Sequence, residues 1–338
     1  MLRLPRFELI EARSYVDAAS LLRAHGAGEL DPARGTPSLR VMTVAGGTDL
    51  FPNMKRRQFT PAVLISLQRV DGATALGVNG TLHLGAGVTL ATLASHPAIV
   101  ERWTALAQSA IAVSTPQLRN AGTIGGNLCL DTRCNWYDQS LFWRSAEGFC
   151  MKTHPEVVCR VAPSSPRCLA VASADTVPAL LALGATVRIE GAGGARDVAV
   201  TDLYREDGIR FLGIGRDEVV VSVTVPDPKG WSSTYQKLRD RGSFDFPLVG
   251  IAAAVRFDGG IVAEARVAIT AVASRAMLVD GAAAALVGSR LDDAAIAAAA
   301  DAVHKAARPM DNTSGTISQR KRTARVFAER ALASLRQH

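Results

Sequence analysis

Four of the five cysteines of this chain lie close together, directly after a glycine-rich segment. The segment is Gly-Thr-Ile-Gly-Gly-Asn at residues 122–127, and the cysteines that follow Cys129 are Cys134, Cys150, Cys159 and Cys168. Thiolates gathered in one loop are good ligands for soft metals. A glycine-rich turn lets backbone N–H groups approach a phosphate. Together these features predict a redox protein that holds a metal centre beside a phosphate-bearing cofactor.

The spacing of the four cysteines bears on the kind of metal. Structural zinc sites commonly use short Cys-x(2–4)-Cys pairs, and every interval between these four cysteines is longer. Iron–sulfur clusters also bind four thiolates, and they accept wider spacing because a cluster is larger than one ion. The spacing therefore favours an iron–sulfur cluster, with zinc and unliganded thiols as alternatives. Cys129 is expected to pack inward, since free cysteine is commonly buried.

Length and composition predict a globular protein of more than one domain. The 338 residues exceed what one hydrophobic core usually serves, and 48% of them are hydrophobic and 20% charged. No run of about 18 apolar residues occurs, and the first residues lack a signal-peptide-like apolar stretch. We therefore expect no membrane span and a cytoplasmic location. Cysteines stay reduced in that compartment, which favours metal ligation over disulfides.

The net charge of +7 comes in part from basic residues at 320–336. They indicate either an acidic partner or the solvated face of a helix. No zinc-finger, RNP or helix-turn-helix signature accompanies them, so nucleic-acid binding is not expected.

Periodicity and turn residues predict an α+β chain with a boundary near residues 226–230, after which strands are followed by helices. The expected strands cover 39–44, 63–67, 81–90, 186–189, 234–238, 249–257 and 261–272. The expected helices cover 14–25, 99–112, 175–183, 276–287, 292–305 and 318–335. A long loop at 128–169 carries the cysteines and several aromatic residues, so we expect a metal centre to organise it.

Two glycine-rich segments are candidates for binding the two phosphates of a dinucleotide. Both contain paired glycines and a threonine hydroxyl, but neither matches a Walker or Rossmann pattern. Taken alone, the first segment is more often a plain turn, and the two together are a stronger signal than either. The candidate residues are Ala45, Gly46, Gly47, Thr48 and Asp49 in the first segment and Thr123, Ile124, Gly125, Gly126 and Asn127 in the second.

Four segments resemble the FAD-binding subunit of the molybdenum hydroxylases, the family of xanthine and carbon monoxide dehydrogenases. They are residues 45–49, 119–127, 173–175 and 237–247, and the similarity runs over nearly the whole chain. The resemblance implies a PCMH-type FAD-binding domain at 1–226, with an iron–sulfur loop insertion at 128–169. It also implies a small α+β domain at 230–338, like the C-terminal domain of the CO dehydrogenase flavoproteins.

The family also implies roles for individual residues. The two glycine-rich segments would hold the FAD pyrophosphate, and Asp175 would be a further FAD contact. Lys237 would lie near the isoalloxazine, where a positive charge favours the anionic reduced flavin. From the residues alone, Asp175 can be a helix N-cap and Lys237 a solvated strand lysine.

Within the family, the cysteine loop resembles the β subunit of 4-hydroxybenzoyl-CoA reductase, which carries FAD and a [4Fe–4S] cluster. The resemblance implies Cys134, Cys150, Cys159 and Cys168 as the cluster ligands, and Cys129 as a non-ligand. A ferredoxin-like donor would then deliver electrons through the [4Fe–4S] cluster and FAD to partner subunits. Those partners are a small [2Fe–2S] subunit and a large molybdopterin subunit, assembled as a dimer of heterotrimers.

The large subunit would convert 4-hydroxybenzoyl-CoA to benzoyl-CoA, so no residue of this chain is expected to act on the substrate. One alternative keeps the fold but sends electrons outward, from a hydroxylating dehydrogenase to NAD or another acceptor. A second alternative is a zinc-stapled assembly subunit without catalysis.

Overall fold

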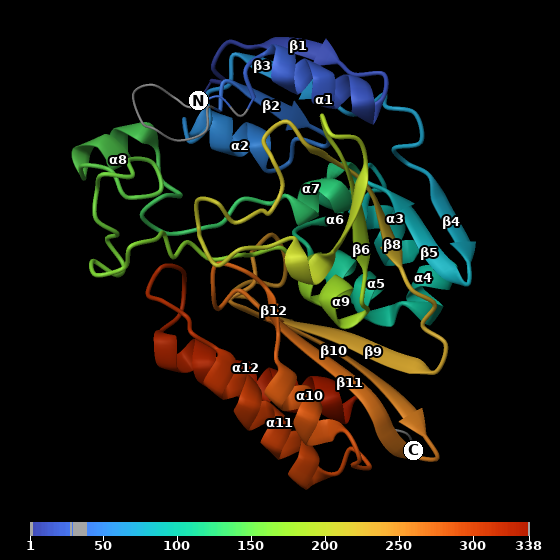
Figure 1. Ribbon diagram of the computed structural model, residues 1–338. Coiled ribbons are helices and arrows are strands. Elements are labelled where there is room, and N and C mark those ends of the chain that lie inside the picture. Colours follow the sequence, from blue (N-terminus) through green and yellow to red (C-terminus); the bar gives the residue numbers. More distant parts are fainter. Residues whose placement is uncertain (1–2, 28, 30–38, 337–338) are drawn as a thin grey trace.

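A computed structural model describes residues 3–27, 29 and 39–336 and shows a chain built on three sheets (Figure 1). The first sheet is parallel, with the order β1 (Glu8–Glu11), β3 (Val63–Ser66), β2 (Val41–Val44). All four residues of the central strand β3 are buried, as expected for a strand inside a parallel sheet. Helices α1 (Tyr15–Ala24) and α2 (Leu50–Lys55) accompany this sheet.

The second sheet is antiparallel and brings distant parts of the chain together. Its order is β4 (Leu76–Asn79), β5 (Thr81–Gly85), β8 (Val219–Val225), β6 (Thr186–Glu190), β7 (Arg196–Ala199). Because β8 pairs between β5 and β6, residues 86–185 form one long excursion from the sheet. The 3-10 helix η1 (Val200–Asp202) follows this excursion. Within the excursion lie the short helices α3 (Leu90–Ser95), α4 (Pro97–Arg102), α5 (Thr104–Ala112), α6 (Pro116–Ala121), α7 (Ile124–Leu128), α8 (Leu141–Ala146) and α9 (Thr176–Ala182).

The third sheet lies between two layers of helices. Its order is β12 (Met277–Leu278), β11 (Ile261–Thr270), β10 (Val249–Asp258), β9 (Trp231–Leu238). Helices α10 (Asp280–Leu286), α11 (Asp293–Ala306) and α12 (Ile317–Ala333) cover one face (orange to red in Figure 1), while α5 and α9 pack against the sheet from the rest of the chain. Along β10, Ala252 and Ala254 join the main core, whereas Ile251 and Val255 join the core beneath α10–α12. This alternation follows the two-residue period of a strand.

Several predicted elements differ in the structure. The helix predicted at 99–112 is two helices, because the fully buried Trp103 interrupts it and donates from Nε1 to the Pro226 carbonyl at 2.9 Å. The strand predicted at 81–90 ends at Gly85, and Thr89 caps α3 through its hydroxyl. The helix predicted at 276–287 begins only at Asp280, since Met277–Leu278 pair with β11 as β12. Strands β1, β4, β7 and β8 were not predicted.

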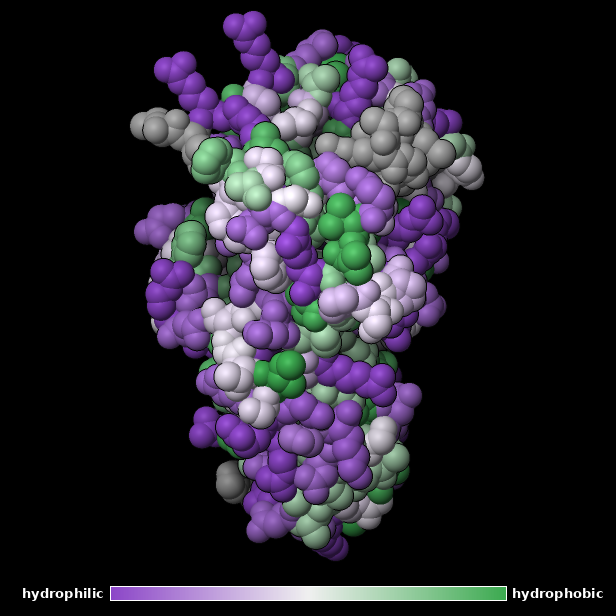
Figure 2. All heavy atoms as spheres, turned by 90° about the vertical axis from the view of Figure 1, so that its left-hand side faces the viewer, coloured by the Kyte–Doolittle hydropathy of each residue, from purple (hydrophilic) through white to green (hydrophobic). Residues whose placement is uncertain are grey.

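One of the basic C-terminal residues is buried in the domain, and another forms ion pairs at its surface. Arg320 is almost fully buried and donates to the backbone carbonyls of Leu248, Met310 and Ala271. Arg325 pairs with Asp301 and Glu329. The interpretation of residues 320–336 as the solvated face of a helix therefore holds for only some of these basic residues. Within the described residues no helix is both long and apolar enough to cross a bilayer. Figure 2 shows the side of the molecule that carries α8, where hydrophobic patches are separated by hydrophilic residues.

Candidate cofactor site

The two glycine-rich segments are in direct contact, although they are far apart in the sequence. The first connects β2 to α2, and the second connects α6 to α7. A Cβ atom on Gly46 would lie 1.8 Å from the carbonyl oxygen of Ala121, and one on Gly122 would lie 3.5 Å from Thr48 Oγ1. Gly47 has φ +67°, in the left-handed region that glycine adopts without strain. Glycine is therefore needed here so that the two backbones can approach each other.

The backbone N–H groups of the two segments have different surroundings. Within the described part of the chain, those of Gly46, Gly47 and Thr48 donate to no other group, so they are available to an anion. In the second segment the four N–H groups of residues 124–127 all donate inside the protein, to Val88 O, Ala86 O, Thr123 Oγ1 and Thr123 O. The first segment is thus the stronger phosphate-binding candidate.

The second segment has clear packing roles. Thr123 caps α7, and a Cβ on Gly125 would lie 2.7 Å from the Cβ of Ala86. Ile124 is buried, and Asn127 Oδ1 accepts hydrogen bonds from the backbone N–H and the hydroxyl of Thr176, at 3.2 and 2.6 Å. These contacts fix the start of α9, which carries Asp175 at its N-cap position.

Asp49 joins the first glycine-rich segment to the cysteine loop. Its carboxylate accepts from Asn53 Nδ2 at 2.8 Å and pairs with Arg133. Arg133 also lies 3.5 Å from Asp138 and stacks over the ring of Phe246, at 3.6 Å from the ring centroid. Burial raises the pKa of Asp49 above its ordinary value, and the charge of Arg133 opposes that shift. Sequence reasoning missed Arg133, because no local pattern marks it.

Asp175 and Lys237 form a buried ion pair. Lys237 Nζ lies 2.9 Å from Asp175 Oδ2, and the two side chains are 4% and 3% exposed. Tyr235 donates to Asp175 Oδ1 at 2.6 Å, and Lys237 also donates to the carbonyls of Ala112 and Asp245. Lys237 is therefore not a solvated lysine, and Asp175 makes no capping hydrogen bond from its side chain. Burial raises the pKa of Asp175 and lowers that of Lys237, while each charge opposes the other's shift.

Three cations converge on the C-terminal end of α5. Lys237 and Arg239 donate to the Ala112 carbonyl at 3.0 and 3.1 Å, and Arg119 donates to the Val113 carbonyl at 2.8 Å. The negative end of the helix dipole favours cations at this position. Burial and the neighbouring charge of Arg239 lower the pKa of Arg119. Since Arg119 precedes Gly122 by three residues, this positive region borders the glycine-rich segments and suits an anionic cofactor.

The four clustered cysteines line one pocket. Cys134, Cys150, Cys159 and Cys168 are all buried, and their side chains enclose it together with Trp136, Tyr137, Met151, Lys152, Arg160 and Val161. Burial raises the pKa of Cys134 to about 12 and that of Cys168 to about 11. Cys129 lies outside this pocket and packs against the main core. Among the described residues, no three His, Cys, Asp or Glu side chains are arranged around a single ion.

The surroundings of Cys168 are closely packed. Its Sγ accepts a hydrogen bond from the Ala170 N–H at 3.4 Å, and a Cβ on Gly208 would lie 2.8 Å from the same sulfur. The Gly208 N–H in turn donates to the Cys168 carbonyl at 2.8 Å. Lys152 Nζ donates to the Gly208 carbonyl at 2.6 Å. Neither Gly208 nor Lys152 belongs to a recognisable motif, so sequence reasoning missed both.

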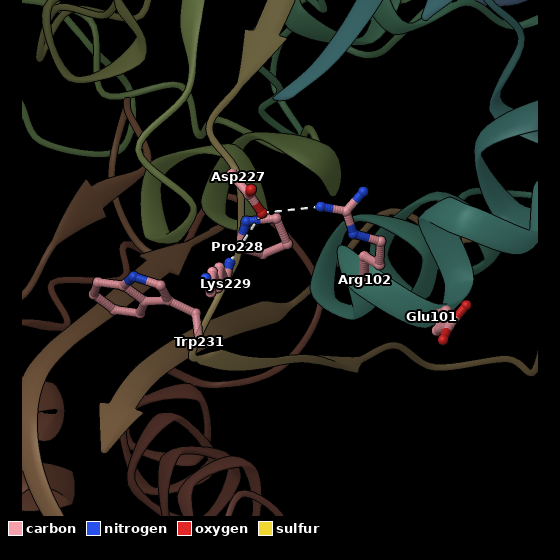
Figure 3. Close-up of a pocket in the computed structure, with 6 residues that line it drawn as sticks. All are labelled: Glu101, Arg102, Asp227, Pro228, Lys229 and Trp231. Carbon is pink, nitrogen blue, oxygen red and sulfur yellow. Dashed lines mark hydrogen bonds and ion pairs between the residues drawn. The ribbon is translucent and has the colours of Figure 1, made fainter. Parts of the chain in front are cut away.

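A second pocket lies where the chain passes from β8 to β9 and contains none of the predicted site residues (Figure 3). Arg102 Nη2 lies 2.9 Å from Asp227 Oδ1 and 3.1 Å from the Gly80 carbonyl, which ties this connection to α4 and to the β4–β5 turn. The lining residues are Glu101, Arg102, Asp227, Pro228, Lys229 and Trp231.

Comparison with known families accounts for nearly the whole chain. The family described as FAD binding domain in molybdopterin dehydrogenase matches residues 5–228, and the CO dehydrogenase flavoprotein C-terminal domain matches residues 233–335. The aldehyde oxidoreductase FAD-binding subunit PaoB of Escherichia coli is 30% identical over 307 residues, which cover 85% of this chain and 90% of PaoB. The carbon monoxide dehydrogenase medium chain of Hydrogenophaga pseudoflava is 27% identical over 332 residues, covering 97% and 96% of the two chains.

The fold agrees with a solved structure. Carbon monoxide dehydrogenase from Hydrogenophaga pseudoflava, in a form lacking the Mo-pyranopterin moiety of its cofactor, matches with a TM-score of 0.77 and 26% identity. The match covers 98% of this chain and 97% of that one. This confirms the predicted fold class, a PCMH-type FAD-binding domain followed by a flavoprotein C-terminal domain. The chain therefore belongs to the molybdenum hydroxylase family, as its FAD-binding medium subunit.

Proposed function

We propose that this subunit carries a [4Fe–4S] cluster in addition to FAD, and that its complex reductively dehydroxylates 4-hydroxybenzoyl-CoA to benzoyl-CoA with electrons from a ferredoxin-like donor. The observation that carries the proposal is the pocket lined by Cys134, Cys150, Cys159 and Cys168. Four thiolates are the ligand set of a [4Fe–4S] cluster. These cysteines are separated along the chain, yet the fold brings all four to one buried place.

The residues around the pocket fit such a cluster. The Ala170 N–H already points at Cys168 Sγ, and hydrogen bonds to ligand sulfurs are among the features that set a cluster's potential. Lys152 and Arg160 add positive charge to the lining. Because burial raises the pKa values of the Cys134 and Cys168 thiols, bound iron would have to keep these two thiolates ionised. When bound, the cluster would supply one-electron transfer and FAD would supply one- or two-electron transfer.

We place FAD on residues 1–226, with the cysteine loop at 128–169 as an insertion and 230–338 as the second domain. The N–H groups of Gly46, Gly47 and Thr48, which donate to no group in the described residues, support pyrophosphate binding at Ala45–Asp49. Residues 123–127 would hold that segment in place and complete the phosphate site. Asp175 and Lys237, which pair with each other, would lie beside the flavin, where the cations at the end of α5 favour its anionic reduced form.

The names of the relatives, medium chain and FAD-binding subunit, support a multi-subunit assembly. The partners we propose are a molybdopterin-containing large subunit and a [2Fe–2S] small subunit, in a dimer of heterotrimers. The substrate would bind on the large subunit, so no residue of this chain would touch it.

A second candidate function is outward electron flow, in a dehydrogenase whose FAD delivers electrons to NAD or another acceptor. It is favoured by the names of the matched relatives, an aldehyde oxidoreductase and a carbon monoxide dehydrogenase. Ready reduction of the flavin by substrate, together with no reduction by low-potential ferredoxin, would establish this direction.

The deciding experiment is anaerobic purification followed by analysis of FAD, iron, sulfide and zinc, with visible and EPR spectra after reduction. About four irons and four sulfides per FAD would support the proposal. Turnover of 4-hydroxybenzoyl-CoA with the partner subunits would then test the substrate. FAD without iron would contradict the cluster, and stoichiometric zinc without flavin would favour the stapled assembly subunit.

Replacement of Cys150 by serine is expected to abolish iron binding and leave FAD bound. Cys150 lines the cysteine pocket, whereas the glycine-rich segments lie outside the loop. The measurement is the iron and flavin content of the purified variant. Cys129→Ser is the matched control and should keep both cofactors, since Cys129 is outside the pocket. Simultaneous loss of iron and FAD from the Cys150 variant would show that the loop is not separable from the flavin site.

A further inference from the structure

Lys152 is a buried lysine whose position the family features do not explain. Its side chain is only 6% exposed. Nζ donates to Asp131 Oδ1 at 2.8 Å, Thr132 Oγ1 at 2.5 Å and the Gly208 carbonyl at 2.6 Å. It also lies over the ring of Tyr137, 4.7 Å from the centroid. Burying an ammonium is costly unless it is paired and hydrogen-bonded, and Lys152 uses its three donors in this way.

Lys152 connects parts of the chain that bear the cysteines. It follows Cys150 by two residues, and Thr132 precedes Cys134 by two. The Gly208 carbonyl that it binds belongs to the residue packed against Cys168, because a Cβ there would lie 2.8 Å from Sγ. The Lys152 side chain thus joins the segments of Cys134 and Cys150 directly, and it reaches Cys168 through Gly208.

Lys152 and its partner Asp131 also differ in their position relative to the cysteine pocket. Its side chain lines the cysteine pocket, whereas its carboxylate partner Asp131 does not. Lys152 is therefore the member of this ion pair that borders the pocket of the four cysteines. Four thiolates make a bound [4Fe–4S] centre anionic, and one added electron makes it more so. A nearby cation in a low-dielectric site favours the more negative, reduced form.

From this geometry we propose that Lys152 is a positioning residue for the cluster, which raises its reduction potential by facing it with a fixed positive charge and joins the cysteine segments through Gly208. The inference rests on the [4Fe–4S] cluster proposed above. Asp131 has the opposite effect, since its carboxylate offsets part of the positive charge of Lys152. The two residues are consequently expected to shift the potential in opposite directions when they are neutralised.

The test is a redox titration of the purified complex, followed by EPR of the reduced cluster, with iron content measured on each sample. Lys152→Met is expected to shift the cluster to a lower potential, and Lys152→Arg to keep it near the wild-type value. Asp131→Asn is expected to shift it to a higher potential. Lys305→Met is the control, because Lys305 is exposed on α11, and it should leave the potential unchanged.

Each outcome supports or overturns the inference. Shifts of opposite sign for Lys152→Met and Asp131→Asn support it. An unchanged potential in an iron-replete Lys152→Met protein overturns it and leaves the cluster itself intact as a proposal. If the Lys152→Met protein loses iron, the potentials of the Lys152→Arg and Asp131→Asn proteins test the inference instead. An Asp131→Asn protein whose cluster potential does not rise refutes the role of the Lys152 charge. A wild-type protein without iron refutes the cluster and this inference together.

Discussion

Replacing Lys237 with methionine is expected to destabilise the protein by about 3–5 kcal/mol, the usual cost of breaking a buried ion pair from one side. The loss arises because Asp175 would keep a buried charge without its cation, and among the described residues only Tyr235 would still donate to it. The carbonyls of Ala112 and Asp245 would also lose their hydrogen bonds from Nζ. Denaturant unfolding of the FAD-loaded and FAD-free proteins measures the change.

The loss of folding stability in the Lys237→Met protein should depend on pH in a defined direction. Burial raises the pKa of Asp175, and without Lys237 the largest opposing effect disappears. A group whose pKa is higher in the folded than in the unfolded state binds its proton more readily when folded, so it favours the folded state at low pH. The deficit should therefore shrink as the pH falls toward the ordinary carboxyl range, about 4. A deficit that grows on acidification would contradict the buried unpaired carboxylate.

Two further variants separate the ion pair from general damage. Lys229→Met removes an exposed lysine shortly before β9 and should change stability by less than about 0.5 kcal/mol. The double variant Lys237→Met with Asp175→Leu should recover part of the loss, since apolar residues often replace a buried pair at little cost. Additive effects in the double variant would show that the two residues do not act as a pair.

Gly46→Ala is expected to weaken FAD binding strongly. The added Cβ would lie 1.8 Å from the carbonyl oxygen of Ala121, which is backbone and cannot rotate away. The two glycine-rich segments would have to separate, and overpacking of this kind costs about 1–3 kcal/mol, occasionally more. If that cost falls on the cofactor-bound form, affinity drops roughly 5- to 150-fold. Flavin fluorescence titration of the FAD-free protein gives the dissociation constant.

Gly77→Ala is the matched control, because nothing lies within 4 Å of a Cβ at that position of β4. It should bind FAD as the unaltered protein does. Unchanged affinity in Gly46→Ala would mean that the close approach of the two segments is not required by the cofactor. Loss of FAD from both variants would instead indicate a general sensitivity of this domain to substitution.

Local patterns were enough to find most of the longer elements and most candidate residues, but not the short helices α2, α3, α6, α7 and α8. The helices predicted at 14–25 and 292–305 are present as α1 and α11, which Ser14 and Asp292 cap. Paired glycines marked the two turns that meet in the structure, and the family resemblance assigned them to FAD. The strands that escaped prediction are mostly short: β1, β4 and β7 have four residues each. A strand of that length has too few residues to show a period of its own and is defined by its partners.

The sequence by itself determined the α+β class, the glycine-rich segments and the clustering of the cysteines, because these depend on residue type and short-range spacing. Only the tertiary structure decided which groups meet. Asp175 pairs with Lys237 across 62 positions, and Arg133 reaches Asp49 across 84. The tertiary structure also decided that, among the described residues, the N–H groups of Gly46 and Gly47 have no acceptor while those of Gly125 and Gly126 do. The physical reason is that buried polar groups must find partners, and packing between distant segments selects them.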